Sequence, residues 1–282
     1  MTDEAPTADA DDGRPDPATQ RAAVRERYGR IATESSSCGS SGCCGDGGAD
    51  GEPSPERARE LGYSDDDLDA VDPGANLGLG CGNPTAIASL EEGDGVLDLG
   101  SGAGFDCFLA AREVGPEGRV VGVDMTPEMV ERGRENAEAN DATNVEFRLG
   151  EIEHLPVADR SVDVILSNCV VNLSPDKPQV FREAYRVLRP GGRLAVSDVV
   201  LTAELPSGLR ADPASVAACV GGASPVPALE TMLSDAGFVG VSVEPKSDSD
   251  EFIRDWDDER DLSDYVVAAT IEGEKPKTGA HP

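Results

Sequence analysis

The chain has 282 residues, of which 38% are hydrophobic and only 4% aromatic, so it is long enough for one or two domains with an aliphatic core. Its formal charge of −31 comes from 24 basic and 55 acidic residues, and a field of that sign repels phosphate backbones and argues against a nucleic-acid partner. No apolar stretch approaches the roughly 20 residues needed to span a bilayer, and the acidic N-terminus lacks a signal-peptide apolar segment, so we expect a cytoplasmic protein without a membrane partner.

Lysine is scarce in this acidic chain. The four lysines are Lys177, Lys246, Lys275 and Lys277. Excess carboxylate with few lysines favours solubility in concentrated salt, because screening relieves the self-repulsion of the charges. The composition therefore predicts a halophilic protein, with an ordinary acidic soluble protein as the alternative.

The first 55 residues are predicted to form an acidic, flexible, cysteine-containing segment. Residues 1–20 are rich in acidic residues, Pro and Ala, which is typical of disorder, and residues 23–32 fit a short helix. Residues 35–55 are a low-complexity run of Ser, Gly and Cys. In a reducing cytoplasm, cysteines of this kind indicate metal-binding or catalytic roles rather than a disulfide framework.

Residues 56–200 carry the pattern of a buried parallel sheet. Short runs of Val, Leu and Ile predict strands at 95–100, 119–124, 145–150, 162–168 and 192–200. Helical patterns lie between most of them, at 105–114, 127–140 and 175–188. Thr126 and Ser174 each precede a proline and are expected helix N-caps. The alternation predicts an α/β, doubly wound, Rossmann-like sheet with sites at the carboxyl ends of its strands.

Residues 201–282 predict a smaller C-terminal α+β portion that completes the sheet. Residues 213–238 fit helices interrupted by a Gly-Gly pair, whereas residues 239–245 and 264–273 fit closing strands.

A glycine loop follows the first predicted strand, in the run VLDLGSGAGFD. Gly100, Gly102 and Gly104 permit a tight turn before a helix N-terminus, and no Lys-Ser/Thr follows, which argues against a P-loop. Asp98 lies inside the strand, where a charge is costly without a partner. Asp124 ends the next strand about 20 residues after the loop, the spacing at which a carboxylate meets ribose hydroxyls.

This combination resembles the class I S-adenosylmethionine-dependent methyltransferases over roughly residues 75–200. The resemblance implies S-adenosyl-L-methionine as cofactor, with Asp124 on the ribose, the glycine loop beside the amino-acid portion, and Glu151 and Ile152 flanking the adenine. The full implied binding set is Asp98, Gly100, Ser101, Gly102, Gly104, Asp124, Met125, Glu151, Ile152 and Asn168.

Three cysteines from separate segments are expected to converge beside this cofactor. Cys169 directly follows the fourth predicted strand, Cys81 lies in the glycine-rich run LGLGCGNP, and Cys219 lies in AACVGGA. Adjacent glycines would permit close backbone approach. Three thiolates suit a soft, three-coordinate ion, and trivalent arsenic fits that chemistry.

The runs NLGLGCGNP, GVDMTPEMV and SNCVVNLSPDK make the chain similar to prokaryotic arsenite methyltransferases from about residue 20 to residue 275. The resemblance implies methylation of arsenite or its thiol conjugates, for arsenic detoxification, with Cys81, Cys169 and Cys219 as arsenic ligands. It also implies that Cys44 hands arsenic inward or takes part in thiol–disulfide chemistry, with thioredoxin or a small thiol as reductant. We expect a monomer.

Other interpretations remain open from the sequence. A methyltransferase for a small organic acceptor, such as a quinone precursor, shares the core but does not need three thiols. A non-enzymatic thiol protein that binds arsenite leaves Asp98, Asp124 and the glycine loop without a purpose. Cys107, inside the helix after the glycine loop, is expected to pack in the core.

Overall fold

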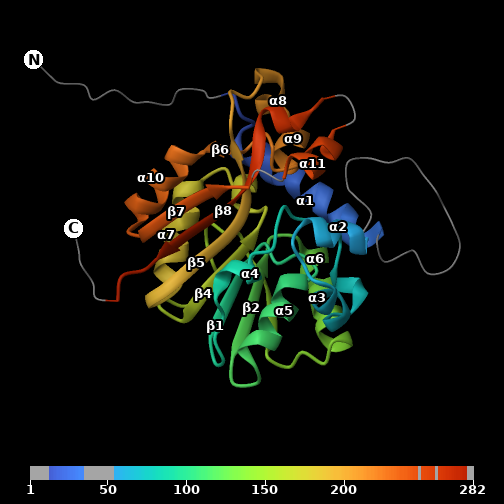
Figure 1. Ribbon diagram of the computed structural model, residues 1–282, viewed down its shortest axis with the longest axis vertical. Coiled ribbons are helices and arrows are strands. Elements are labelled where there is room, and N and C mark those ends of the chain that lie inside the picture. Colours follow the sequence, from blue (N-terminus) through green and yellow to red (C-terminus); the bar gives the residue numbers. More distant parts are fainter. Residues whose placement is uncertain (1–12, 35–53, 247–248, 258–259, 278–282) are drawn as a thin grey trace, which may run out of the picture.

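The predicted core strands lie side by side in one sheet, shown in Figure 1, in a computed structural model that describes residues 13–34, 54–246, 249–257 and 260–277. The sheet has eight strands in the order β3-β2-β1-β4-β5-β8-β7, with β6 paired to β5. The strands are β1 Gly95–Leu99, β2 Arg119–Asp124, β3 Val145–Leu149, β4 Val162–Asn168, β5 Leu188–Leu201, β6 Ser224–Pro225, β7 Val239–Pro245 and β8 Val266–Glu274.

Strands β1 to β5 are parallel, and β8 runs antiparallel between β5 and β7. The α/β prediction with a doubly wound sheet is confirmed, and the C-terminal strands extend that same sheet. The largest difference from the predicted strand bounds is in β5, which begins at Leu188 rather than at residue 192.

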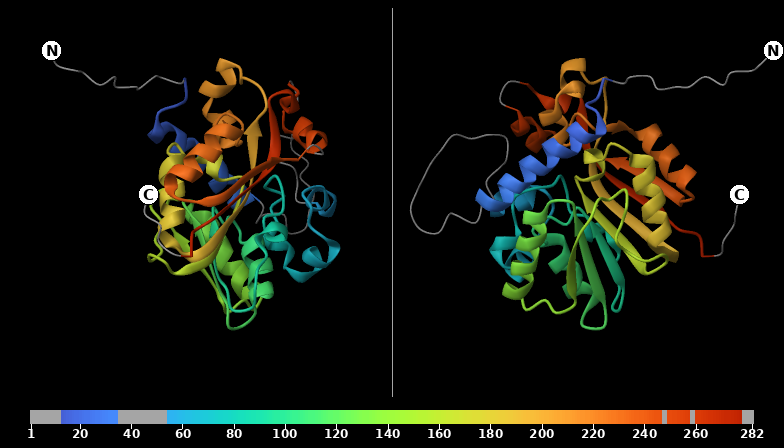
Figure 2. Two further views of the ribbon diagram at one scale, coloured as in Figure 1. Left: turned by 60° about the vertical axis from the view of Figure 1, so that its left-hand side comes forward. Right: turned by 180° about the vertical axis from the view of Figure 1, so that it is seen from behind.

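Helices cover both faces of the sheet (Figures 1 and 2). Successive β1 residues point to opposite sides: Val96 packs in the cluster that holds Phe108, and Leu97 packs in the cluster that holds Phe181. The helices are α1 Pro17–Glu34, α2 Pro55–Glu60, α3 Asp65–Ala70, α4 Thr85–Ala88, α5 Phe105–Val114, α6 Pro127–Ala139, α7 Lys177–Val187, α8 Ser207–Ala211, α9 Pro213–Ala217, α10 Val226–Ala236 and α11 Asp250–Ile253, with 3-10 turns η1 Pro73–Ala75, η2 Val171–Leu173, η3 Arg254–Trp256 and η4 Leu262–Asp264.

Helix α1 is longer than the predicted helix over 23–32, and residues 17–20, predicted as disordered, lie within it. Asp16 accepts hydrogen bonds from the backbone N–H groups of Ala18 and Thr19 at 3.0 and 3.2 Å, which starts the helix. The buried Gln20 amide donates to the Leu173 carbonyl at 2.9 Å. The Gln20 contact joins α1 to η2, and the helix runs over one end of the sheet in the rear view of Figure 2.

The predicted N-cap Ser174 is wrong. Asp176 caps α7 instead, by accepting from the Gln179 N–H at 3.0 Å. The Ser174 hydroxyl donates to the Glu153 carboxylate at 2.7 Å, so it binds the loop after β3 and does not cap the helix. Thr126 does occupy the N-cap position of α6, although its side chain makes no capping hydrogen bond.

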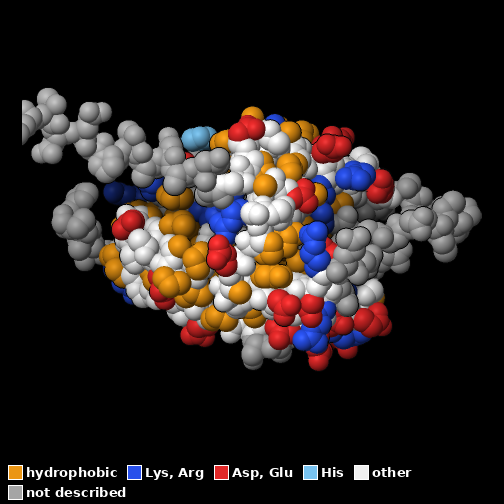
Figure 3. Space-filling model, turned by 90° about the horizontal axis from the view of Figure 1, so that it is seen from above, with side chains coloured by type: hydrophobic (Ala, Val, Ile, Leu, Met, Phe, Trp, Pro, Cys, Tyr) orange, Lys and Arg blue, Asp and Glu red, His pale blue; other side chains and the backbone are white. Residues whose placement is uncertain are grey.

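Arginines on the surface lie among the numerous carboxylates. Seen from above, basic side chains stand beside acidic ones, with hydrophobic side chains spread between them (Figure 3). Exposed pairs include Arg59–Asp65 at 2.7 Å and Arg254–Asp261 at 3.3 Å. Within the described ranges no helix is both long and apolar enough to cross a membrane.

Candidate functional site

A cavity of about 1140 Å³, including its open mouth, lies at the carboxyl ends of β1, β2 and β4. We call it the first cavity. Helix α1 and the loop after β3 also contribute to its wall. Of the predicted cofactor residues, the wall includes Asp98, Gly100, Ser101, Gly102, Asp124, Met125, Ile152 and Asn168, but not Gly104 or Glu151.

The glycine loop forms the floor of the first cavity between β1 and α5. Gly100 has φ +68°, and a Cβ there would collide with the Val170 side chain, so the loop needs glycine at this point. Gly104 is the N-cap of α5 and packs against Phe108 and Phe147, which explains why it lies outside the cavity wall. Gly104 therefore sets the turn, and its predicted contact with the cofactor stays a prediction.

The Asp124 carboxylate is held at the end of β2 by backbone donors. One oxygen accepts from the Gly102 N–H at 3.0 Å and the other from the Thr126 N–H at 2.8 Å. Burial raises the pKa of Asp124, and these hydrogen bonds oppose that shift. The lone pairs that remain can accept hydrogen bonds from hydroxyl groups of a ligand in the cavity.

Two further carboxylates, Asp98 and Asp106, line the same cavity. Burial raises the pKa of Asp98 well above its ordinary range, and the charge of Asp106 adds to this rise. The Tyr63 hydroxyl donates to Asp106 at 2.7 Å, and the Asn168 amide donates to the Tyr63 oxygen at 3.1 Å. Two buried carboxylates on one cavity favour a positively charged ligand group, because such a group offsets the cost of burying them.

Replacing Asp106 by asparagine is expected to change how stability depends on pH. Burial raises the pKa of Asp106 from 3.8 to about 6, so its stabilising contribution is complete below pH 3.8 and is lost as the pH rises through about 6. Relative to Asp106→Asn, the ligand-free wild type should lose up to about 3 kcal/mol of unfolding free energy across this window. Urea unfolding of both proteins at a series of pH values measures the difference, and parallel pH profiles would contradict it.

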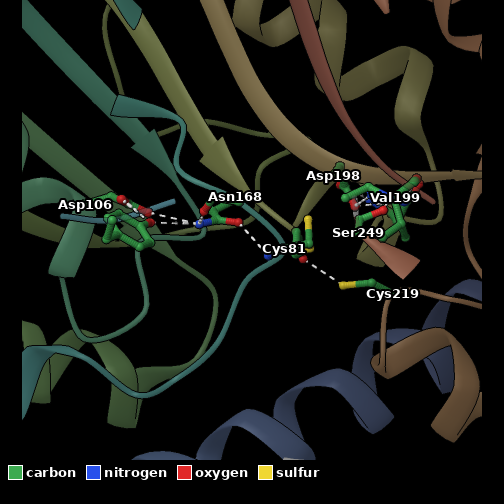
Figure 4. Close-up of a disulfide and its surroundings, with 12 residues drawn as sticks. Cys81, Asp106, Asn168, Asp198, Val199, Cys219 and Ser249 are labelled. Atoms are coloured by element: carbon green, nitrogen blue, oxygen red, sulfur yellow. Dashed lines mark hydrogen bonds between the residues drawn. A yellow bond between two sulfur atoms is a disulfide. The ribbon is translucent and has the colours of Figure 1, made fainter. Parts of the chain in front are cut away.

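The three predicted arsenic ligands lie near one another. Figure 4 shows the disulfide at Cys81 and the Cys219 thiol beside it, and Cys169 lines the first cavity. Cys81 and Cys169 form a disulfide with a Cα–Cα distance of 6.0 Å. The Cys219 thiol donates to the Cys169 carbonyl at 2.8 Å. Free thiolates are expected from the sequence, whereas the structure pairs Cys81 with Cys169, because the loop before β1 and the end of β4 are adjacent.

Asn168 connects these cysteines to the carboxylate end of the cavity. Its side-chain oxygen accepts from the Cys81 N–H at 3.0 Å, while its amide nitrogen donates to the Gly82 carbonyl at 2.7 Å and to the Tyr63 oxygen (Figure 4). Burial raises the pKa of the Cys219 thiol well above its ordinary range, and the charge of Asp198 adds to the effect. The thiol is therefore protonated at neutral pH.

The other cysteines lie elsewhere. Cys107 is fully buried in the core, as predicted, and its thiol donates to the Asp98 carboxylate at 3.2 Å. Cys38, Cys43 and Cys44 lie outside the described residues, so the role predicted for Cys44 stays a prediction.

A second cavity of about 570 Å³ meets the first at Tyr28, Leu79, Gly80 and Cys169. Cys219 contributes to its wall, together with Arg27, Arg57 and Trp256. Cys169 therefore lines two cavities. One has the glycine loop and the carboxylates in its wall, and the other has the Cys219 thiol, arginines and an aromatic ring.

Glu151 faces helix α1 rather than the first cavity. It accepts from Arg25 at 2.8 Å and pairs with Arg21 at 3.4 Å, while Glu153 and Ile152 line the cavity beside it. The contribution of this helix to the wall of the site was not predicted from the sequence. Asp106 was not predicted either, although a carboxylate directly after the glycine loop in the first turn of α5 was a usable indication.

Curated proteins similar to this chain include arsenite methyltransferases. Residues 90–259 match a family model described as a methyltransferase domain. An arsenite methyltransferase of Halobacterium salinarum is 57% identical over 270 residues, which are 93% of this chain and 68% of that protein. The human arsenite methyltransferase is 36% identical over 225 residues, which are 76% of this chain and 57% of the human protein.

A solved structure agrees with these relatives. The crystal structure of an arsenic(III) S-adenosylmethionine methyltransferase from Chlamydomonas reinhardtii superposes with a TM-score of 0.59 and 34% identity. The match covers 82% of this chain and 76% of the algal chain.

Proposed function

The chain belongs to the S-adenosylmethionine-dependent arsenite methyltransferases, and from this premise we propose that it methylates trivalent arsenic held by the thiolates of Cys81, Cys169 and Cys219. The observation that carries the proposal is the position of Cys169 in the wall shared by both cavities. A methyl donor in the first cavity and an acceptor in the second would meet beside its sulfur.

The residues of the first cavity fit S-adenosylmethionine. Asp124 offers fixed acceptors to ribose hydroxyls. Asp98 and Asp106 offer carboxyl oxygens to a cationic amino-acid portion, whose charge would favour their ionised forms. The Ser101 hydroxyl is a buried polar group without a hydrogen-bond partner among the described residues, and it lies in the same wall. When bound, S-adenosylmethionine supplies a sulfonium methyl group that a lone pair can attack.

The Cys81–Cys169 disulfide must open before arsenic can bind. A thiol reductant such as thioredoxin or a small dithiol would deliver two electrons and two protons, leaving two thiols beside Cys219. Arsenite would then exchange its three hydroxyl groups for three sulfurs and release three waters, which removes the thiol protons. A buried thiol with a raised pKa suits this exchange, because the neutral arsenic–sulfur product avoids burying thiolate charge.

Trivalent arsenic carries its own lone pair, so the acceptor atom has no proton to lose and the site needs no general base. The contribution of the protein is then to position the reactants, which can supply on the order of 7–11 kcal/mol. Methyl transfer formally oxidises arsenic, so the same class of reductant is needed between rounds. We further propose a role in arsenic detoxification in the cytoplasm of a halophilic cell, by a monomeric enzyme.

Arsenic speciation after turnover tests the proposal. Protein incubated with arsenite, S-adenosylmethionine and a dithiol should yield methylated arsenic and arsenite-dependent S-adenosylhomocysteine. Without the dithiol, the disulfide-bonded protein should yield neither. Binding of arsenite without transfer would favour a thiol binding protein, and transfer only to an organic acceptor such as a quinol would favour the other alternative.

A further inference from the structure

Cys169 and Cys219 both adopt left-handed backbone conformations, with φ of +54° and +68°. Among the described residues only Ser89, Asp141 and Arg160 share this feature without being glycine. Side chains other than glycine reach this region at a cost, and such conformations persist when the surrounding structure over-determines them. Something around the two cysteine turns must therefore hold them.

The Cys169 turn is held by Asp198, a carboxylate in β5 that is 1% exposed. Asp198 accepts from the backbone N–H of Asn172 at 3.1 Å and from its side-chain amide at 2.8 Å. The same Asn172 amide donates to the Val199 carbonyl at 2.7 Å. The 3-10 turn that follows Cys169 is thus fastened to β5 by three hydrogen bonds.

The Cys219 turn is held against that fastened segment. Lys177, which is 3% exposed, donates from Nζ to the Gly222 carbonyl at 2.6 Å. Gly222 packs on the Asn172 carbonyl so closely that a Cβ at this position would collide with it. The ammonium of Lys177 also interacts favourably with the Asp198 carboxylate.

We propose that Asp198, Asn172 and Lys177 are positioning residues that hold the Cys169 and Cys219 turns at the separation required to capture arsenic. This inference rests on the proposed function. None of the three has to touch the methyl donor, because none of them lines the first cavity. Asp198 approaches the sulfurs, since its carboxylate and the sulfurs of Cys81 and Cys169 all lie within 4.8 Å of one another.

A purely structural role is the competing explanation, and a second buried lysine provides a matched control. Lys275 is 7% exposed and donates from Nζ to the Leu188 carbonyl at 2.8 Å and to the Tyr185 carbonyl. Leu188 begins β5, whereas Asp198 lies near its other end. Lys177→Met and Lys275→Met therefore remove the same group from opposite ends of the sheet.

The experiment compares these variants and Asp198→Asn with the full-length wild type in reduced form. Arsenite binding is followed by arsenic–sulfur absorbance, S-adenosylmethionine binding by calorimetry, folding by melting temperature, and turnover by arsenic speciation. Lys177→Met and Asp198→Asn should lose arsenite affinity and about 100-fold in kcat/KM for arsenite, with unchanged cofactor affinity. Lys275→Met should lose melting temperature but neither arsenite affinity nor turnover per folded molecule.

The positioning role is refuted if Lys275→Met weakens arsenite binding as much as Lys177→Met does. It is equally refuted if Lys177→Met and Asp198→Asn bind arsenite like the wild type. If Lys177→Met does not fold, Asp198→Asn decides, since it keeps the size of the side chain. A wild type that binds arsenite without methylating it contradicts the proposed function alone, because the binding comparison still stands.

Discussion

Cys169→Ser should abolish methylation of arsenite, with kcat falling by at least about 100-fold, while S-adenosylmethionine still binds with its normal affinity. A serine hydroxyl is a hard oxygen donor and a poor ligand for soft trivalent arsenic. The position matters as well, because Cys169 lines both cavities. Arsenic speciation measures the loss of methylated product, and calorimetry measures whether S-adenosylmethionine still binds.

Cys107→Ser is the matched control for this prediction. It makes the same chemical change at a fully buried cysteine, and serine can still donate to Asp98 as the thiol does. The control should retain most activity. Turnover of arsenite by Cys169→Ser at a rate close to the wild type would remove Cys169 from the ligand set.

Asp124→Asn should weaken S-adenosylmethionine binding by about 10- to 100-fold, which corresponds to the loss of one hydrogen bond to a charged group. Both carboxylate oxygens accept backbone N–H groups, so an amide nitrogen there would face the donor of Gly102 or of Thr126. The substitution removes an acceptor for ribose and disturbs the glycine loop together. Arsenite binding by the reduced cysteines should be unchanged, which calorimetry and absorbance titration can show on one sample.

Asp163→Asn provides the comparison for Asp124→Asn. Asp163 also accepts a backbone N–H, from Gly95 at 2.9 Å, but at the start of β1, away from the site. Cofactor affinity should not change in this variant. Equal affinities of the wild type and Asp124→Asn would show that the carboxylate does not hold the cofactor.

The strand and helix pattern of the core could be predicted because it is local. Five runs of aliphatic residues alternate with helical periods, and a parallel sheet with helices on both faces is what such alternation builds. The glycine loop and Asp124 could be found for the same reason, since their spacing is fixed inside one strand–helix–strand unit. Ser174 was misassigned because two adjacent segments compete for one hydroxyl, and Glu153, from the preceding loop, is its partner.

Other parts of the site depend on contacts distant in sequence. Glu151 pairs with Arg21 and Arg25 of α1, more than a hundred residues earlier in the chain, and its predicted place beside the adenine stays a prediction. Nothing in the sequence around Asp198 predicts its hydrogen bonds to Asn172, which lies 26 residues earlier in the chain. Short-range spacing along the sequence does not predict such long-range pairs.

The sequence by itself determined the class of fold and the position of the glycine loop, because each follows from residue type and short-range spacing, whereas the three arsenic ligands stay a prediction. Only the tertiary structure decided that Cys81 and Cys169, 88 residues apart, share a disulfide bond and that the Cys219 thiol donates to the Cys169 carbonyl. The same holds for the buried hydrogen bonds of Asp198, Asn172 and Lys177 around them. The physical reason is that sheet order and two left-handed turns, rather than the positions of the cysteines in the chain, set the distances between the sulfurs.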